Sequence, residues 1–266
     1  RGIAMPELPD VEIYRKYLES TALNQEISKV DFYCPRVLKE IGEAELKSAL
    51  KGRKLTAARR HGKHLFAALD DGNWLVLHFG MTGFLVYFKD PEKRPPHVCM
   101  HLSFCNGYGL AYDCQRKLGQ VSVTGDMKTY VKKLGLGLDA LDPELRFAAF
   151  TDRIGKGRAM IKSALMDQER ISGIGNIYAD EILFQAGVHP KAKAGELQGD
   201  ALKALFDKRK RVLETAIDRK ADPDDFPRTY IIPRRKAGAS CPKCHGPIET
   251  TKVSGRTTYY CPHCQK

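Results

Sequence analysis

The chain has 266 residues, of which 42% are hydrophobic, and a formal net charge of +12. This length suffices for one large domain or two moderate ones, and the excess of Lys and Arg favours a polyanionic partner, although a basic surface can also serve solubility alone. No run approaches 18 apolar residues and no apolar signal core begins the chain, so neither a membrane span nor export is predicted, and a cytoplasmic protein is expected.

The first notable segment, residues 5–12, reads Met-Pro-Glu-Leu-Pro-Asp-Val-Glu. Pro9 suits a first helical turn, and Val11, Tyr14 and Leu18 form one apolar face, so a helix is predicted directly after Pro6. A proline at the start of a chain carries a secondary amine that can attack an electrophilic carbon, whereas an internal proline has only an amide nitrogen. Residues 1–4 are therefore expected to be an appended segment ahead of a natural start at Met5.

Residues 26–124 show a strand-like pattern. Short apolar or alternating runs lie at 27–32, 74–79, 84–88 and 98–104, and turn signals lie at 71–73, 80–83 and 106–107. Many short strands at this spacing predict an antiparallel β-sandwich.

The pattern changes after residue 132. Residues 132–139 with Asp142-Pro143 are typical of a linker, and helical periodicity follows around 161–165 and 179–186, where Gly187 ends the second helix. The predicted class is α+β, with a sandwich domain at 1–134, a linker at 135–150, a helical domain at 151–235 and a cysteine-containing C-terminal segment at 236–266. Glycines in the loop 171–176 let backbone N–H groups approach an anion, although a tightly packed turn has the same composition.

Four of the eight cysteines form two CxxC pairs, namely Cys241, Cys244, Cys261 and Cys264. Sixteen residues separate the pairs, a spacing that allows four thiolates to surround one structural Zn²⁺ ion. Disulfides are the alternative, and His245 or His263 could replace one ligand. The other four, Cys34, Cys99, Cys105 and Cys114, are predicted to be small buried residues.

Between the two CxxC pairs, residues 248–252 and 256–260 are β-prone and residues 253–255 form a turn. Arg256 is thus predicted near the tip of a metal-stabilised hairpin. An arginine there can reach a phosphate, although it can equally be a solvated surface residue.

Residues 5–12, the loop 173–181 and the four-Cys hairpin together resemble formamidopyrimidine-DNA glycosylase and its relative endonuclease VIII, over nearly the whole chain and in the same order. The resemblance implies an N-terminal helix and β-sandwich, then a helix-two-turn-helix domain with a zinc hairpin. It further implies an enzyme that flips a damaged base out of double-stranded DNA, releases it by attack of the proline on the sugar, and cleaves the strand by elimination from a Schiff base.

The resemblance also implies roles for individual residues. Pro6 would be the nucleophile, Glu7 would pass a proton to the opening sugar ring, and Lys63 would contact the phosphate of the damaged nucleotide. The residues implied to bind DNA are Asn176, Arg256, Met81, Arg116 and Leu118. Without the resemblance, Glu7 is equally a carboxylate that interacts with a helix dipole, and Lys63 is part of a basic turn.

Three departures from the family pattern affect specificity. Residues 113–119 are one residue longer than usual and carry Leu118 where the family has an aromatic wedge, so either Arg116 or Lys117 is expected to face the orphaned base. Asp10 replaces a glutamate. Residues 221–227 and 233–236 replace a Gly-rich lesion-capping loop, so the excised lesion, the opposite-base preference and the course of elimination stay open.

Two functions are compatible with these features. The first is a monomeric repair glycosylase with AP lyase activity that acts on DNA with a damaged base or abasic site and associates with the nucleoid. The second is a lesion-binding protein with little catalysis, because Pro6 is not the chain terminus. A zinc-ribbon accessory factor of transcription or replication explains the cysteines and the charge, but not Pro6 and Glu7.

Overall fold

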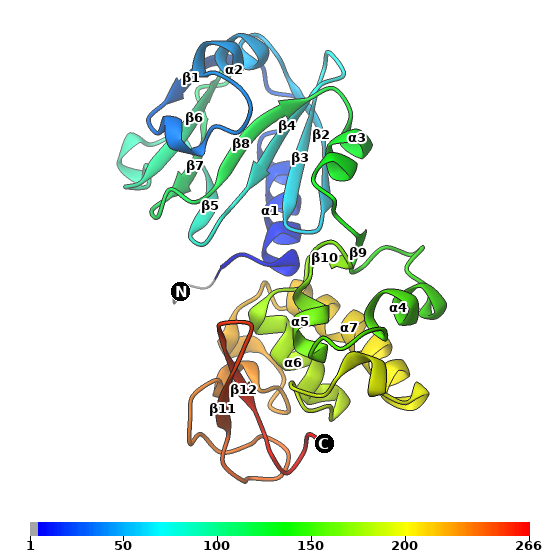
Figure 1. The fold of residues 1–266 in the computed structure, drawn as a ribbon. Helices are drawn as coiled ribbons and strands as arrows, with labels where there is room; N and C mark the ends of the chain where they lie inside the picture. Colours follow the sequence, from blue (N-terminus) through cyan, green and yellow to red (C-terminus); the bar gives the residue numbers. More distant parts are fainter. Residues whose placement is uncertain (1–4) are drawn as a thin grey trace. The chain divides into compact units, whose positions relative to one another are not determined.

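The computed structural model describes residues 5–266, so residues 1–4, the predicted appended segment, lie outside the described residues. The chain forms two compact units (Figure 1). The first comprises the residues up to Pro6 and residues 10–134, and the second comprises Glu7–Pro9 and Gly135–Lys266. Over residues 5–266, no helix is both long enough and apolar enough to cross a membrane.

The first unit contains two four-stranded antiparallel sheets. One has the order β1 (Ile27–Phe32), β6 (Val98–Phe104), β7 (Gly109–Cys114) and β5 (Gly83–Phe88). The other has the order β2 (Leu55–His61), β3 (His64–Leu69), β4 (Trp74–His78) and β8 (Gln120–Thr124). The helices are α1 (Leu8–Thr21), α2 (Glu43–Leu50) and α3 (Met127–Lys133).

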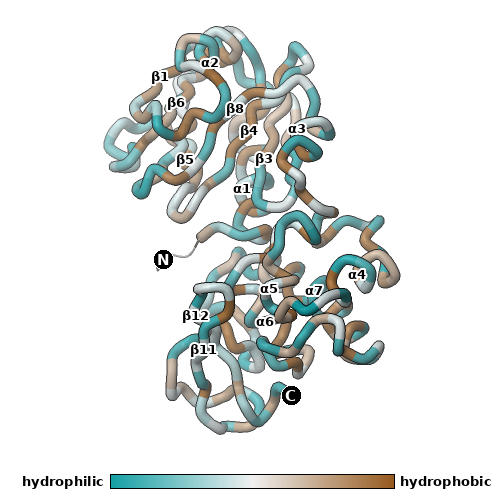
Figure 2. Tube along the Cα trace, in the orientation of Figure 1, coloured by the Kyte–Doolittle hydropathy of each residue, from teal (hydrophilic) through white to brown (hydrophobic). Residues whose placement is uncertain are grey.

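One hydrophobic cluster joins α1 to both sheets. Val11 and Leu18 of α1 pack with Leu77 of one sheet and with Leu102 and Tyr112 of the other, and all five side chains are at most 1% exposed. Hydrophobic residues are frequent along the strands in Figure 2. The predicted antiparallel sandwich with an N-terminal helix is therefore confirmed.

The second unit is mainly helical. It contains α4 (Phe147–Ile154), α5 (Ile161–Met166), α6 (Asn176–Ala186) and α7 (Gly199–Asp218), together with a short parallel pair of strands, β9 (Leu138–Asp139) and β10 (Ile171–Ser172). Every residue from 178 to 184 is buried, since α6 packs against α5, α7 and the hairpin. Short 3₁₀ segments occur in both units at Pro35–Val37, Pro91–Lys93, Ala194–Glu196, Pro223–Asp225 and Ile232–Arg234.

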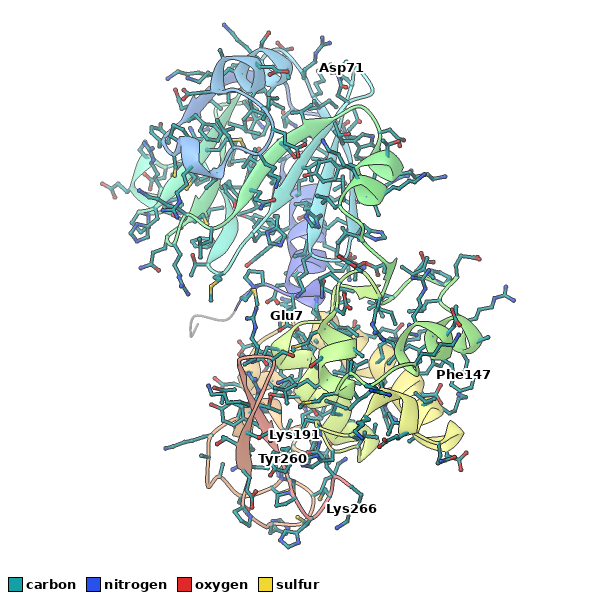
Figure 3. All side chains as sticks on the ribbon, viewed as in Figure 1. Glu7, Asp71, Phe147, Lys191, Tyr260 and Lys266 are labelled. Carbon is teal, nitrogen blue, oxygen red and sulfur yellow. The ribbon has the colours of Figure 1, made fainter. Side chains whose placement is uncertain are left out.

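The C-terminal hairpin pairs β11 (Glu249–Val253) with β12 (Arg256–Tyr260). Ser254 and Gly255 form its turn with φ values of +48° and +73°, as a two-residue turn with both residues in the left-handed region requires. Val253 was predicted in the turn but pairs with Arg256 at the end of the ladder. The ring of Tyr260, which Figure 3 labels, packs edge-on against His189 with 4.9 Å between the ring centroids, and this contact links the hairpin to the segment after α6.

The segment predicted as a linker, residues 135–150, contains β9 and the first half of α4. Phe147 and Phe150 begin this helix because both rings pack against Phe206 of α7, at 5.6 and 5.5 Å between centroids. The Gly, Asp and Pro residues before α4 predicted a linker, but tertiary packing stabilises a helix in its second half.

Candidate active site and zinc centre

Glu7, the residue after Pro6 that Figure 3 labels, is hydrogen-bonded to the start of α6. It is 1% exposed, and its Oε2 accepts hydrogen bonds from the N–H groups of Gly175 (2.7 Å) and Tyr178 (3.3 Å). Its Oε1 accepts one from the N–H of Ile177 (2.8 Å). The carboxylate therefore satisfies N–H groups that a helix start leaves unpaired, and its charge interacts favourably with the positive end of the helix dipole.

Two glycines in the preceding loop allow this close approach. A Cβ on Gly175 would lie 2.4 Å from Cδ of Glu7, and a Cβ on Gly173, whose φ is +111°, would lie 2.6 Å from Leu8. The N–H of Leu8 also donates to the carbonyl of Gly173 (3.0 Å). The loop was predicted either to receive an anion or to pack tightly, and it does both, because the anion is the carboxylate of Glu7.

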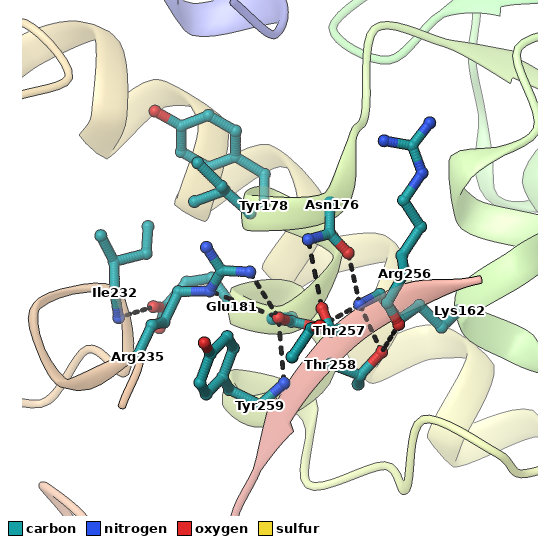
Figure 4. Close-up of polar contacts among 12 residues, drawn as sticks. Lys162, Asn176, Tyr178, Glu181, Ile232, Arg235, Arg256, Thr257, Thr258 and Tyr259 are labelled. Atoms are coloured by element: carbon teal, nitrogen blue, oxygen red, sulfur yellow. Dashed lines mark hydrogen bonds and ion pairs between the residues drawn. The ribbon is translucent and has the colours of Figure 1, made fainter. Parts of the chain in front are cut away.

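A buried ionic cluster lies behind Asn176 (Figure 4). The Nζ of Lys162, a fully buried side chain, pairs with Asp180 (2.6 Å) and donates to Oδ1 of Asn176 and to Oγ1 of Thr258, both at 2.7 Å. Burial lowers the pKa of Lys162, and the carboxylate of Asp180 opposes that shift. The other oxygen of Asp180 accepts from Arg235 (2.8 Å).

The same cluster fixes the hairpin beside Asn176. The side-chain amide of Asn176 donates to the carbonyl of Thr257 (3.2 Å), and Thr257 directly follows Arg256. Arg256 is exposed, and its guanidinium points away from the bonded cluster in Figure 4. Asn176 and Arg256 are two of the residues that the family resemblance implies to bind DNA. They are linked through Thr257, which follows Arg256 and accepts the hydrogen bond from Asn176.

Lys63 occupies the turn between β2 and β3, after Gly62 with a φ of +56°. Arg60 steadies this turn, because its guanidinium donates to the carbonyl of Gly62 (3.0 Å) and to Glu12 of α1 (3.1 Å). The neighbouring imidazole of His64 is buried, which lowers its pKa to about 3 and leaves it uncharged. The turn is basic, as expected, and the hydrogen bond between Arg60 and Glu12 connects it to α1.

Met81, Arg116 and Leu118 lie on two loops of the first unit that touch each other. The N–H of Arg116 donates to Oγ1 of Thr82 (3.0 Å), and a Cβ on Gly80 would lie 2.5 Å from the backbone of Leu118. Leu118 is 42% exposed and is one of four large hydrophobic residues that are exposed among residues 5–266. The loop that carries Met81 therefore lies against the later loop that carries Arg116 and Leu118.

Sequence reasoning missed the functional context of Lys162, Asp180 and Arg235. Lys162 stands among Ile161, Ala164 and Leu165 and resembles an ordinary exposed lysine at the edge of an apolar face. Nothing in a single sequence shows that its ammonium group is buried against a carboxylate two elements later. The position of Asp180 in the loop motif was the one usable signal.

The four predicted zinc ligands come together in the second unit. The Sγ atoms of Cys241, Cys244, Cys261 and Cys264 all lie within 4.8 Å of one another, at 3.8 Å for Cys241 and Cys264 and 3.4 Å for Cys244 and Cys261. Tetrahedral zinc with Zn–S bonds of about 2.3 Å places its sulfurs roughly 3.8 Å apart. The donors thus fit one zinc ion, without His245 or His263, and these separations are far longer than an S–S bond.

Glu181, next to Asp180, is fully buried and accepts hydrogen bonds from Gln185 (2.7 Å) and from the N–H of Ile232 (2.9 Å). Burial raises its pKa to about 7, and these two donors only partly offset the effect. Glu181 therefore titrates near neutrality and joins α6 to the segment that carries Arg235.

Zinc removal is expected to melt the hairpin and weaken α6. Chelation should abolish the protection of the amides of β11 and β12 in hydrogen exchange, because little apolar area holds the hairpin without the metal, and added Zn²⁺ should restore it. Cys244→Ser should mimic chelation. Cys105→Ser should not, because Cys105, which was predicted to be buried, is exposed and lies outside the cluster. Full protection after chelation would contradict a structural zinc site.

The stability of the protein is expected to fall between about pH 4.5 and 7 through Glu181. In this window the unfolded chain loses the proton while the folded protein keeps it, so the free energy of unfolding decreases as pH rises and then levels off. Glu181→Gln should flatten this slope in urea titrations at saturating zinc, even if it costs a constant amount through a changed hydrogen bond. The exposed Glu144→Gln should keep the slope, and equal slopes in all three proteins would refute the assignment.

Comparison with known proteins matches both units. Family models describe residues 5–121 as a formamidopyrimidine-DNA glycosylase N-terminal domain, 136–225 as its H2TH domain and 240–266 as a zinc finger found in FPG and IleRS. Together with the four cysteines, the last match establishes a single structural zinc ion.

Whole-chain relatives agree. The formamidopyrimidine-DNA glycosylase of Pelobacter propionicus is 31% identical, over 98% of this chain and 100% of its own. That of a Nocardioides species is 34% identical, over 98% and 94%. The Lactococcus lactis enzyme, solved non-covalently bound to DNA containing an AP site, is 28% identical with a TM-score of 0.88 and covers 98% of this chain and 99% of its own. This chain therefore belongs to the formamidopyrimidine-DNA glycosylase family.

Proposed function

We propose that this protein is a base-excision-repair DNA glycosylase that acts on double-stranded DNA with a damaged base or an abasic site. The observation that carries the proposal is the bonding of Glu7 to the start of α6, which anchors the residue after Pro6. Solved relatives from Lactococcus lactis are complexes with AP-site DNA and with DNA containing Fapy-dG. AP lyase activity is typical of the family.

Pro6 is the proposed nucleophile in a chain that begins with it. Its secondary amine forms a bond to C1′ of the sugar while the glycosidic bond breaks and the base leaves with the bonding electron pair. An α-amino group with a pKa of about 7.7–8.0 is appreciably neutral at pH 7. With Met5 attached, the nitrogen is an amide and has no available lone pair, so this form binds lesions without catalysis.

Glu7 is proposed to take the proton that the Pro6 nitrogen loses on bonding to C1′ and to pass it to the ring oxygen of the opening sugar. Ring opening leaves an iminium ion between the Pro6 nitrogen and C1′, and loss of a proton from C2′ then expels the 3′ phosphate by elimination. The hydrogen bonds from the backbone N–H groups at the start of α6 restrict the rotamers of Glu7, so its carboxyl group is preorganised for the reaction.

Asn176, Arg256 and Lys63 are proposed to bind phosphates around the lesion. Support comes from the fixed neighbourhood of Asn176 and Arg256, and from the steadied turn that carries Lys63. Lys162 accounts for the orientation of the Asn176 amide, since its ammonium group can only donate and therefore selects the amide oxygen.

Met81, Arg116 and Leu118 are proposed to fill the space that a flipped nucleotide leaves in the duplex. Unstacking a base costs a few kcal/mol, which inserted side chains offset. An exposed leucine beside a methionine on two mutually bonded loops supplies apolar area for that purpose, and Arg116 supplies hydrogen-bond donors for the orphaned base.

Borohydride trapping tests the nucleophile. Abasic-site DNA should crosslink to a chain that begins at Pro6 and not to the 266-residue chain, because only the former has a secondary amine, and mass spectrometry should place the crosslink on Pro6. Trapping of the 266-residue chain through Lys63 or another lysine would contradict the assignment. If neither form is trapped but both bind lesions tightly, the lyase assignment fails and the protein is a lesion-binding protein.

Arg256→Gln tests the phosphate contact. The affinity for abasic-site DNA should fall by roughly tenfold to a hundredfold, since a hydrogen bond to a charged group contributes about 1.5–3 kcal/mol. Arg228→Gln removes the same charge from another exposed position of the second unit and is the matched control. Gel-shift titrations at fixed salt measure both, and similar losses in the two variants would mean that only net charge matters.

A further inference from the structure

The first unit contains a cavity of about 500 Å³ that the proposed reaction does not use. Residues from α1, β2, β4 and the start of α3 line it. They are Glu12, Arg15, Ala58, Arg59, Arg60, Trp74, Asp126, Met127 and Lys128. Cavities of this size in proteins accommodate small organic ligands.

One wall of the cavity is apolar and aromatic. Trp74 and Met127 line it together, and both also pack against the buried pair Phe66 and Val76, which holds them in place. The guanidinium of Arg59 lies over the ring of Trp74, 5.5 Å from its centre. In such a stack the face of the guanidinium covers the ring while its edge keeps N–H groups for an anion.

The charged residues divide into paired and unpaired groups. Glu12 binds Arg15 (2.7 Å) and Arg60 (3.1 Å), and Arg15 also binds Glu19 (2.6 Å), so both arginines are already engaged in ion pairs. In the part of the chain that the structure describes, the side chains of Arg59 and Lys128 make no salt bridge or hydrogen bond. Two cations therefore remain available at the cavity.

The second carboxylate that lines the cavity, Asp126, forms no ion pair with Arg59 or Lys128 in the described part of the chain. Asp126 accepts a hydrogen bond from the N–H of Thr129 (2.6 Å) at the start of α3. It is committed to this cap, so an incoming anion meets Arg59 and Lys128 rather than preformed ion pairs.

We propose that this cavity is a second nucleotide-binding site, with the phosphate on Arg59 and Lys128 and the base against Trp74 and Met127. A purely inorganic anion would leave the apolar wall unused, and a purely apolar ligand would leave both cations unused. Aromatic side chains combined with unpaired cations are the means by which proteins bind unpaired nucleotides. The site is independent of the proline chemistry.

Trp74 makes the test specific, because it is the only tryptophan in the chain. Its fluorescence should change saturably when the protein is titrated with dTMP or with a 5′-phosphorylated trinucleotide of thymidines at fixed ionic strength. Inorganic phosphate should bind at least about tenfold more weakly, as expected when the base contributes about 1.4 kcal/mol. Tighter binding of the trinucleotide would identify a DNA strand as the source, and equal affinities of both would identify a single nucleotide.

The double variant Arg59→Gln/Lys128→Gln should raise the dissociation constant at least tenfold. The control Arg36→Gln/Lys51→Gln removes the same charge from exposed positions of the first unit and should change it less than twofold. Calorimetric titration supplies constants that do not depend on the altered surroundings of Trp74.

Three results would overturn the proposal: no saturable signal with either nucleotide, equal affinity for inorganic phosphate, or equal weakening in the two double variants. Borohydride trapping by the form that begins at Pro6 should persist in Arg59→Gln/Lys128→Gln. The nucleotide site and the glycosylase assignment can therefore fail separately.

Discussion

The packing of the second unit depends on the ion pairs and hydrogen bonds of the Asp180 carboxylate. It pairs with Lys162 of α5, accepts from Arg235 beyond α7 and accepts from the N–H of Tyr259 in the zinc hairpin (3.2 Å). A buried ion left without its partner typically costs about 3–5 kcal/mol, so these segments must assemble together. Because Lys162 also holds Asn176, the same assembly orients the side chain proposed to bind DNA.

Features that depend on local chemistry could be predicted from the sequence. Spacing alone identified the four cysteines, and Gly187, with a φ of +71°, ends α6 as predicted. The pattern gave no separate run for β2, β3, β7 or β8, and the six residues of β7 are all buried and therefore show no alternation. It also missed α4, where the packing of Phe147 and Phe150 on Phe206 decides the conformation.

The candidate site was less predictable than the fold, because its key contacts join distant segments. Glu7 contacts the N–H groups of residues about 170 positions later, and Lys162 contacts Thr258 across 96 positions. Motif resemblance supplied Glu7 and Asn176, but the geometry that relates them exists only in the folded chain. Likewise, the contact between the loops of Met81 and Leu118 follows from sheet pairing, which periodicity does not specify.

The zinc hairpin has a thermodynamic consequence beyond its own stability. Residues 257–259 of β12 supply partners to Asn176, Lys162 and Asp180, so the folded hairpin and the ordered cluster favour each other. Such coupling is reciprocal. The free energy by which bound metal stabilises the ordered cluster equals the free energy by which the ordered cluster strengthens metal binding. DNA that selects the ordered cluster should therefore raise the affinity for zinc, so the metal contributes to DNA binding although it takes no part in the proposed chemistry.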